Sequence, residues 1–497
     1  MSTKKTLLTS WPGHWTFVLA AVGSAAGLGN VWRFPYLAYE HGGAAFFIAY
    51  ILCLVLVGFP LLLMENTMGQ KTKKAAGEAM AAAHKSGVFR SIGFWGVLAA
   101  SVVMGYYAVV MSWSVNFLVA APSLAWAGDA KVFFFENILH LSDNISEKGE
   151  FLPHLLLGLL AVWTAIFLSL SRGMKSIATV VTYITPLPFF FLGILAINGL
   201  FLENAAEGLS FFFLPVFEKL LSFDLWIAAI SQVFFTLTLG FGVMFAYGAL
   251  LKKKTDIIAA VKAVIIGDTL VSFISGIAIF STLGYMAGQQ GVPVSEVVAG
   301  GPGLAFVVFP SALSILPFGN SLFAILFFLT LLTLAITSAI SLVQAIISMI
   351  SDYCSVKNHT LVVFLVCAFL AASSLLYARS NGLYILDIVD HYIVNYGLVA
   401  VGLAEVIVLG WVFGSQKIQK YANRHAKKPL GNWYNFSVRY FVPFVLAAVL
   451  GNSITNDLSR PYEGYASEAL FSYGVIPVVS TFCIALLLSI PTRNCHK

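Results

Sequence analysis

The chain has 497 residues, of which 59% are hydrophobic and 10% are charged, and its mean hydropathy is +0.89. Because a soluble domain carries about 25% charged residues, this composition excludes a soluble globular protein and indicates a polytopic membrane protein. The net charge of +6 requires no nucleic-acid partner, since the placement of the Lys and Arg residues accounts for it.

Apolar segments of the roughly 20 residues needed to cross a bilayer recur along the chain and predict twelve transmembrane helices. Their ranges are 15–37, 42–68, 91–122, 154–170, 176–201, 224–250, 257–287, 320–351, 360–377, 383–413, 434–454 and 469–491. If both chain ends are cytoplasmic, most of the 28 Lys and Arg residues fall in inner loops or at inner helix ends, which is the positive-inside pattern. The sequence therefore predicts a multi-pass protein with both ends inside, and its first apolar segment is typical of mature protein rather than of a signal peptide.

Two of the predicted helices contain residues that weaken a helix in lipid. The first contains GSAAGLGN at residues 23–30, and the sixth contains Gly240 and Gly242 after a Thr-rich turn. Each opens a block of five spans, and interrupted helices at matching positions of two halves point to a transport site. Glycines alone would fit close helix packing equally well. The neighbouring polar residues Asn30 and Thr236 favour the interruption.

Further polar residues lie within the seventh and eighth spans. Asp268 is ionisable, and an ionisable residue inside a span is a functional candidate by default, although a protonated structural carboxyl or a position near the interface would also fit. For Thr337 and Ser338 taken alone, hydroxyls that bond to their own helix are the favoured interpretation. Oxygen ligands without clustered His or Cys suit an alkali cation better than zinc or copper.

Three longer motifs are more specific. They are VGSAAGLGNVWRFPYLAYEHGGAAFFIAY, FFTLTLGFGVMFAYG, and GPGLAFVVFP at 301–310. In this order they resemble the first helix, the sixth helix and the outer loop between helices seven and eight of the neurotransmitter:sodium symporter family, and the resemblance runs from residue 11 to about 450. It implies the leucine-transporter fold, which is all-α with a five-plus-five inverted repeat and unwound helices 1 and 6. It also implies a bacterial amino-acid transporter of the inner cell membrane, not an enzyme, that couples a small zwitterion to sodium.

The resemblance divides the chain into five parts. These are a cytoplasmic N-terminus at 1–14, a first five-helix repeat at 15–201, a second at 224–413, helices 11 and 12 at 434–491, and a cytoplasmic C-terminus at 492–497.

Two sodium sites are expected by this resemblance, without an organic cofactor. The first comprises the Ala25 carbonyl, Asn30, Thr236 and Asp268, with the substrate carboxylate as a further ligand. The second comprises the carbonyls of Gly23, Ala26 and Leu334 and the hydroxyls of Thr337 and Ser338.

The resemblance also implies a substrate pocket built from helices one, three, six and eight. Its expected lining is Ser24, Ala25, Leu28, Gly29, Val103, Tyr107, Val110, Phe235, Thr236, Thr238, Phe241, Ser338 and Leu342. The Gly29 amide and the Tyr107 hydroxyl would bind the substrate carboxylate. Amine transporters of the family carry Asp where this chain has Gly27, which favours an amino acid. The apolar lining favours a neutral, hydrophobic or aromatic side chain, because burying an unpaired charge is costly.

The family's chloride site would fall beside Asp268, on Tyr50, Gln232, Thr236 and Ser272. Chloride-dependent relatives carry Asn at the position of Asp268, and a built-in carboxylate can supply the charge that chloride supplies elsewhere. The sequence therefore predicts transport without chloride. A buried carboxyl that loses its sodium ion is also a candidate to bind a proton on the return step.

Two gates are expected. Arg33 and Asp390 match the outer gate pair above a lid of Tyr107 and Phe235, and Trp11 and Asp352 match the inner gate. The inner gate departs from the family, because Leu8 stands where the family has Arg and Ala249–Leu250 replaces Ser-Tyr. Asp352 is therefore expected to pair with Lys4, with Lys5 or with nothing.

Glu65 and Glu405 match family carboxyls, for which a structural and a proton-linked role both remain open. The altered inner gate leaves a second hypothesis for the whole chain, a sodium-dependent amino-acid sensor or leaky channel on the same fold. The sequence leaves open the particular amino acid, the ion stoichiometry and the oligomeric state.

Overall fold

The computed structural model describes residues 10–84, 87–147, 149–298, 300–354 and 358–490. Within these ranges every regular element is a helix, either an α-helix or a shorter 3-10 or π segment labelled η. The predicted segments 1–14 and 492–497 lie partly or wholly outside the described residues.

The first half of the chain forms a series of apolar helices joined by short connections. In order they are α1 (His14–Ala25), η1 (Leu28–Asn30), α2 (Arg33–Glu40), α3 (Ala44–Cys53), η2 (Leu54–Gly58), α4 (Phe59–Thr72), α5 (Ala76–Ala81), η3 (Gly87–Phe89), α6 (Arg90–Ala120), η4 (Ala121–Ser123), α7 (Ala130–Val132), η5 (Phe133–Ile138), α8 (Pro153–Ser171), α9 (Met174–Ile184), α10 (Pro186–Leu200), α11 (Ala205–Phe213) and η6 (Phe217–Leu221).

The second half continues in the same way. Its elements are α12 (Phe223–Thr236), α13 (Val243–Ala249), α14 (Ile257–Gln290), α15 (Val294–Val297), η7 (Leu304–Val308), α16 (Phe309–Ser314), α17 (Asn320–Cys354), α18 (His359–Ser374), α19 (Gly382–Tyr392), η8 (Ile393–Leu398), α20 (Val399–Ile407), η9 (Val408–Gly414), α21 (Ser415–Asn423), α22 (Trp433–Phe436), η10 (Ser437–Phe441), α23 (Val442–Ser459), η11 (Tyr462–Gly464), α24 (Ser467–Ala469), η12 (Leu470–Val475) and α25 (Ile476–Ser489).

Each of the twelve predicted spans coincides with a helix or with consecutive helices. By length and composition, nine helices of the described residues could cross a membrane, and α1 with η1 and α2 forms a tenth, broken span bent by 66°. The sixth predicted span is divided between the short helices α12 and α13, and the ninth, α18, has only 16 residues. The prediction of an all-α membrane protein with an interrupted first helix is confirmed.

Local chemistry sets the ends of the long helices. The carboxylate of Asp256 accepts a hydrogen bond from the Ala259 amide (3.0 Å) and caps the start of α14, because the first amides of a helix lack partners within it. Gly291 ends the helix with a φ of +64°, a conformation that glycine adopts without strain. The helix between these caps carries Asp268, which is fully buried.

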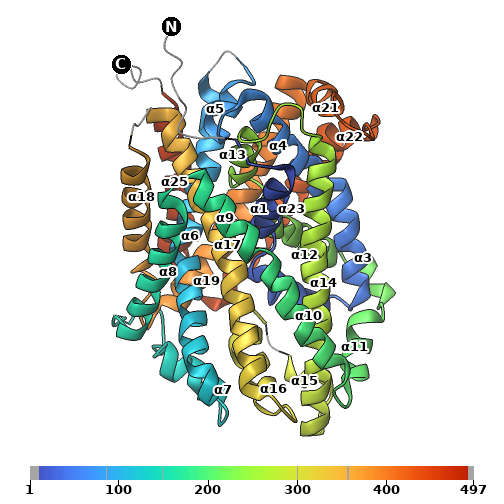
Figure 1. The fold of residues 1–497 in the computed structure, drawn as a ribbon, viewed down its shortest axis with the longest axis vertical. Coiled ribbons are helices and arrows are strands. Elements are labelled where there is room, and N and C mark those ends of the chain that lie inside the picture. The colour runs from blue at the N-terminus through green and yellow to red at the C-terminus, as the bar shows by residue number, and fades with distance from the viewer. Residues whose placement is uncertain (1–9, 85–86, 148, 299, 355–357, 491–497) are drawn as a thin grey trace.

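The two interrupted helices lie in the interior of the bundle. Figure 1 shows α1 surrounded by neighbouring helices, and α1 packs against α9, α14 and α17. The side chains of Phe17, Leu28 and Phe34 are essentially inaccessible. This burial places the backbone of the first break where helices from both halves of the chain can reach it.

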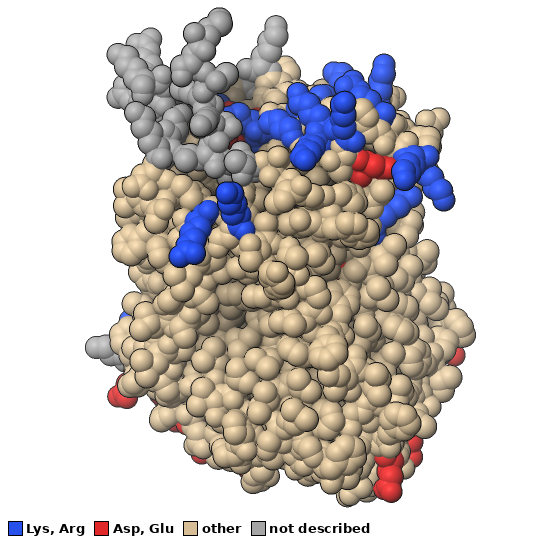
Figure 2. Space-filling view, viewed as in Figure 1, with Lys and Arg blue, Asp and Glu red and all other residues tan. Residues whose placement is uncertain are grey.

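Basic side chains gather at one end of the molecule. Figure 2 shows Lys and Arg concentrated at the end where Figure 1 places α5, α21 and α22, while the middle of the visible face is almost free of charge. A charge-free band between polar ends is what a lipid bilayer requires. The division into two five-helix repeats stays a prediction.

Candidate functional site

The first helix loses its helical path at Ala26 and Gly27. Ala26 has φ −72° and ψ 98°, and Gly27 has φ −121° and ψ −165°, so both residues are extended. The Asn30 side-chain oxygen accepts a hydrogen bond from the Gly27 amide (2.9 Å) and starts the next turn. The extended stretch leaves carbonyls of the preceding turn without their usual helical donors, and these carbonyls are available to other partners.

The sixth predicted helix is interrupted between α12 and α13. Thr238, Gly240 and Gly242 all have positive φ angles, of 54°, 76° and 77°. Two of the three positions are glycine because other residues are strained in this region. The Thr238 hydroxyl donates to the Ser24 carbonyl (3.1 Å), so the two interrupted helices meet directly.

Asp268 lies at the centre of a buried polar network that joins four helices. Its Oδ1 accepts hydrogen bonds from the Thr236 hydroxyl (2.7 Å) and from Asn30 Nδ2 (2.8 Å), and its Oδ2 accepts one from the Tyr50 hydroxyl (3.2 Å). Asn30 also donates to Ser272 (2.8 Å). All five side chains are at most 1% exposed. The side chains expected at the first sodium site and three of those expected at the chloride site, Tyr50, Thr236 and Ser272, therefore belong to one connected cluster, of which Asp268 is the only carboxylate.

The predicted chloride-site residue Gln232 lies outside this network. It is fully buried, and neither its side-chain oxygen nor its side-chain nitrogen has a hydrogen-bond partner among the described residues.

The expected second sodium site falls where α1 meets α17. Ser338 Oγ donates to the carbonyls of Gly23 and Ser24, both at 3.2 Å. Thr337 Oγ1 instead donates to the Thr333 and Leu334 carbonyls of its own helix (3.1 and 3.0 Å). A hydroxyl bonded to its own helix, as expected for each of these residues taken alone, is therefore found for Thr337. The Ser338 hydroxyl instead bonds to the first break. No hydrogen bond between described residues links Ala26 to either hydroxyl.

A small cavity of about 40 Å³ lies between the two breaks. Ten of the predicted pocket residues line this cavity, together with Gly27 and Asn30. The other three predicted residues, Gly29, Val110 and Thr236, do not line it. The ten are Ser24, Ala25, Leu28, Val103, Tyr107, Phe235, Thr238, Phe241, Ser338 and Leu342. Thr236 instead faces Asp268. The lining contains no Asp, Glu, Lys, Arg or His.

Gly29 lies beneath the aromatic lid without lining the cavity. A Cβ at Gly29 would lie 2.4 Å from the Phe235 ring, so the close approach of ring and backbone requires glycine. The Arg33 guanidinium lies 5.2 Å from the centre of the same ring, within the range of a cation–π contact. Phe235 therefore contacts both the cavity and Arg33.

The outer gate pair is not in direct contact. Arg33 and Asp390 form no ion pair within 4.0 Å. Arg33 Nη2 donates to the Ser231 hydroxyl (2.8 Å), and the Tyr106 hydroxyl donates to Asp390 (2.5 Å). The structure thus assigns each charged residue a neutral partner, Ser231 one turn before Phe235 and Tyr106 next to Tyr107. The gating role itself stays a prediction.

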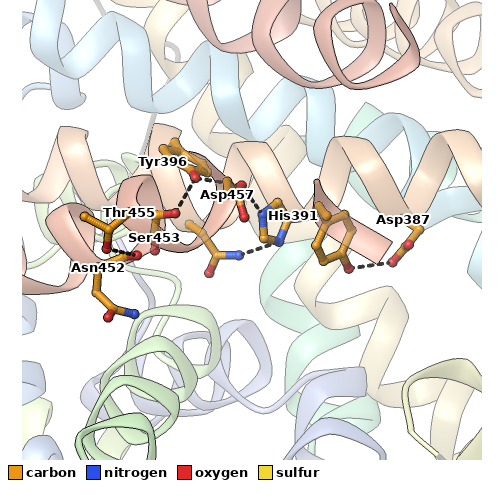
Figure 3. A network of polar contacts seen from close by, with 9 residues as sticks. Asp387, His391, Tyr396, Asn452, Ser453, Thr455 and Asp457 are labelled. Atoms are coloured by element: carbon orange, nitrogen blue, oxygen red, sulfur yellow. Dashed lines mark hydrogen bonds and ion pairs between the residues drawn. The ribbon is translucent and has the colours of Figure 1, made fainter. Parts of the chain in front are cut away.

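A second polar network holds the Asp390 helix from outside (Figure 3). His391 contacts Asp457 of α23 (2.8 Å), and the Tyr396 hydroxyl donates to the same carboxylate (2.7 Å). Asp387 accepts hydrogen bonds from Tyr462 and Tyr465, both at 3.0 Å. These contacts tie α19 and η8 to α23 and to the segment that follows it.

Ser231→Ala is expected to weaken closure of the outer gate. The change removes a hydrogen bond to a charged group, an interaction of about 1.5–3 kcal/mol, so bound substrate should dissociate about tenfold faster. The measurement is the release rate of labelled substrate from purified protein. Ser101→Ala is the matched control, because the Ser101 hydroxyl donates to the Val97 carbonyl of its own helix. Equal release rates in both variants would contradict a role of Ser231 at the gate.

The inner gate residues have partners that the sequence did not indicate. Asp352 pairs with Lys74 (3.3 Å) and accepts a hydrogen bond from the Ala75 amide (2.7 Å). The alternative that Asp352 has no partner is therefore wrong. The expected partners Lys4 and Lys5, like Leu8, lie outside the described residues. Lys74 was missed because only the packing of α5 against α17 brings it to Asp352.

Trp11 seals the inner end of α13. Its indole N–H donates to the Tyr247 carbonyl (3.1 Å), its amide donates to the Leu250 carbonyl (3.1 Å), and only 2% of the residue is exposed. The indole and the amide of Trp11 thus each bond to one carbonyl at or just after the end of α13. Trp11 and Asp352 lie at the same end of the bundle but share no hydrogen bond among the described residues.

Asp352→Ala is expected to make the transporter leak more than Lys74→Ala does. The Lys74 side chain is 44% exposed, and such pairs contribute about 0–1 kcal/mol. The Ala75 amide, by contrast, loses its acceptor when Asp352 is truncated. Efflux of substrate from preloaded vesicles should rise several-fold for Asp352→Ala and less than twofold for Lys74→Ala. Equal efflux would show that the ion pair, not the amide contact, closes this end.

The two buried glutamates lie near the second break. Glu65 accepts a hydrogen bond from the Gly240 amide (3.0 Å), while both Glu405 oxygens lack a hydrogen-bond partner among the described residues. Glu65 thereby holds the left-handed backbone at Gly240. The structural role expected for it has a geometric basis, and the proton-linked alternative stays open.

Comparison with known proteins agrees with this arrangement. The model of the family described as "Sodium:neurotransmitter symporter family" matches residues 9–131 and 123–495. An "uncharacterized sodium-dependent transporter" of Methanocaldococcus jannaschii is 36% identical over 480 residues, which cover 96% of this chain and 97% of that protein. The chain belongs to the sodium:neurotransmitter symporter family.

Other relatives carry more specific names. The human sodium- and chloride-dependent GABA transporter 2 is 32% identical over 448 residues, or 82% of this chain and 74% of its own length. The sodium-dependent dopamine transporter of Caenorhabditis elegans is 28% identical over 505 residues, or 92% and 82%. As a member of this symporter family, the chain is a multi-pass, sodium-dependent symporter and not an enzyme. Family membership does not specify the substrate, nor the bacterial amino-acid branch expected from the resemblance.

Proposed function

We propose that this symporter carries a neutral, hydrophobic or aromatic L-amino acid together with sodium, by alternating access and without chloride. The observation that carries the proposal is the cavity at the two helix breaks, whose lining is apolar apart from hydroxyl, amide and backbone groups and contains no Asp, Glu, Lys, Arg or His. Such a lining offers partners for a zwitterionic head and an apolar side chain. A charged side chain would remain unpaired there.

The environment of Gly27 supports a substrate with its own carboxylate. A Cβ at Gly27 would lie 3.1 Å from Ser338 Oγ and 3.5 Å from the Tyr107 hydroxyl. The Tyr107 hydroxyl is buried and has no well-formed hydrogen bond among the described residues. A hydroxyl donor in this position, next to a glycine that supplies no acid, suits a carboxylate brought in by the substrate.

The Asp268 network supports sodium coupling without chloride. The hydroxyl oxygens of Thr236 and Tyr50 lie within 3.2 Å of its carboxylate, and hard oxygen ligands of this kind suit an alkali cation. The carboxylate already supplies one negative charge in a buried place. With the Gly23 and Ser338 cluster, this makes two candidate sodium sites. Placement in the inner cell membrane with both termini cytoplasmic belongs to the same proposal and is supported by the gathering of basic residues at one end of the molecule (Figure 2).

Uptake into proteoliposomes tests the proposal. A panel of labelled leucine, methionine, phenylalanine, tryptophan, glutamate, lysine, GABA and dopamine is offered with an inward sodium gradient, with chloride replaced by gluconate and with pH gradients imposed separately. We expect concentrative uptake of an apolar amino acid that survives loss of chloride. Transport of GABA or dopamine alone, or collapse without chloride, would contradict it. Sodium-dependent binding without uptake would favour the sensor or leaky channel.

A further inference from the structure

Thr185 occupies an unusual position among the threonines of the predicted spans. The hydroxyls of most of them donate to a carbonyl of their own helix four residues earlier, as threonines in membrane helices commonly do. The examples are Thr179, Thr182, Thr269, Thr282, Thr330, Thr333 and Thr337. Thr185 Oγ1, in contrast, has no hydrogen-bond partner among the described residues, although Thr185 is only 3% exposed.

The unpaired hydroxyl faces the first helix at Gly23. A Cβ at Gly23 would lie 2.7 Å from Thr185 Oγ1 and 3.2 Å from Thr337 Oγ1. The missing side chain of Gly23 therefore leaves room into which two hydroxyls from different helices point. The carbonyl of the same glycine accepts a hydrogen bond from Ser338. Oxygen atoms from three segments, α1, the α9–α10 junction and α17, thus lie around one residue.

The local sequence favours further oxygen atoms at the α9–α10 junction. Thr185 separates α9 from α10 and precedes Pro186, with Pro188 two residues later. A proline has no N–H, so Pro186 cannot donate to the Thr182 carbonyl and Pro188 cannot donate to the Ile184 carbonyl. An unpaired hydroxyl in a stretch with uncommitted carbonyls is costly inside a membrane unless something else satisfies it.

We propose that Thr185 supplies an additional oxygen ligand, from the fifth predicted span, to a sodium ion held by the Gly23 carbonyl and the hydroxyls of Thr337 and Ser338. A neutral hydroxyl suits a weakly held monovalent cation, because it adds a ligand without adding charge. The ligand would tie the α9–α10 junction to the first break when sodium is present. The proposal rests on the sodium coupling proposed above and adds a ligand from a helix not assigned to either expected site.

Sodium titration of purified protein tests this ligand without any substrate. The midpoint of sodium-dependent thermal stabilisation is measured with choline as the replacing cation, for the wild type, Thr185→Val, Thr185→Ser and Thr182→Val. Thr185→Val removes the hydroxyl and keeps the shape, Thr185→Ser keeps the hydroxyl, and Thr182→Val is the matched control, three residues away with its hydroxyl bonded to its own helix.

We expect Thr185→Val to raise the sodium concentration at the midpoint about tenfold, in line with the 10–100-fold losses seen when groups that support a metal site are removed. Thr185→Ser and Thr182→Val should titrate like the wild type. A wild-type midpoint in Thr185→Val, or no sodium effect in the wild type, would overturn the proposal. If Thr185→Val does not fold, loss of the sodium response in Thr185→Ser would overturn it as well. Failure of the amino-acid panel with this titration intact would instead reject the proposed substrate.

Discussion

Asp268→Asn is expected to make transport depend on chloride. In the wild type the carboxylate accepts hydrogen bonds from Thr236, Asn30 and Tyr50. The substitution keeps the size of the side chain but removes the only negative charge of this buried network, and hydrogen bonds to charged groups contribute about 1.5–3 kcal/mol each. Uptake in gluconate should therefore fall at least about tenfold, and added chloride should restore a part of it.

The measurement is sodium-driven uptake of the preferred amino acid across a chloride titration. Asp387→Asn is the matched control. This variant also removes a carboxylate that accepts hydrogen bonds from tyrosines, but that carboxylate lies outside the Asp268 network. Its uptake should remain independent of chloride. Chloride-independent uptake by Asp268→Asn, or a chloride requirement in the wild type, would reject the role assigned to this carboxylate.

Gly27→Asp is expected to abolish amino-acid transport while leaving the fold intact. A Cβ at this position would lie 3.5 Å from the Tyr107 hydroxyl and 3.1 Å from the Ser338 hydroxyl, which must shift by a few tenths of an ångström to accommodate it. The new carboxylate would occupy the place proposed for the carboxylate of the substrate, and two carboxylates in one buried site cannot both be accommodated as anions. We expect a loss of uptake of about a hundredfold or more.

Gly27→Asn separates charge from volume, because it adds a side chain of the same size without charge. It should retain measurably more uptake than Gly27→Asp. Melting temperature and sodium-dependent stabilisation of both variants report the fold independently of substrate. Unchanged uptake in Gly27→Asp would show that the residue at position 27 does not select the substrate class. Equal losses of uptake in both variants would show that the added volume, not the added charge, impairs transport.

Much of the architecture could be predicted because its causes are local. The length of an apolar segment decides whether it can cross a bilayer, so the spans appear in the sequence one by one. The break in the first helix could be predicted from GSAAGLGN, and Gly240 and Gly242 marked the second, since a positive φ favours glycine. The lining of the cavity was predictable for a different reason, because motif resemblance assigns residues to positions without requiring their contacts.

Partner choice was decided only by tertiary structure. Arg33 bonds to Ser231 rather than to Asp390, Asp352 bonds to Lys74, and the Thr185 hydroxyl faces Gly23. The partners lie far apart in the chain, and a polar side chain pairs with whichever group the packed helices bring within about 3 Å. The sequence by itself thus determined the membrane spans and the position of the first break, through hydropathy and backbone freedom, whereas the packing of the helices decided which oxygen and nitrogen atoms meet there.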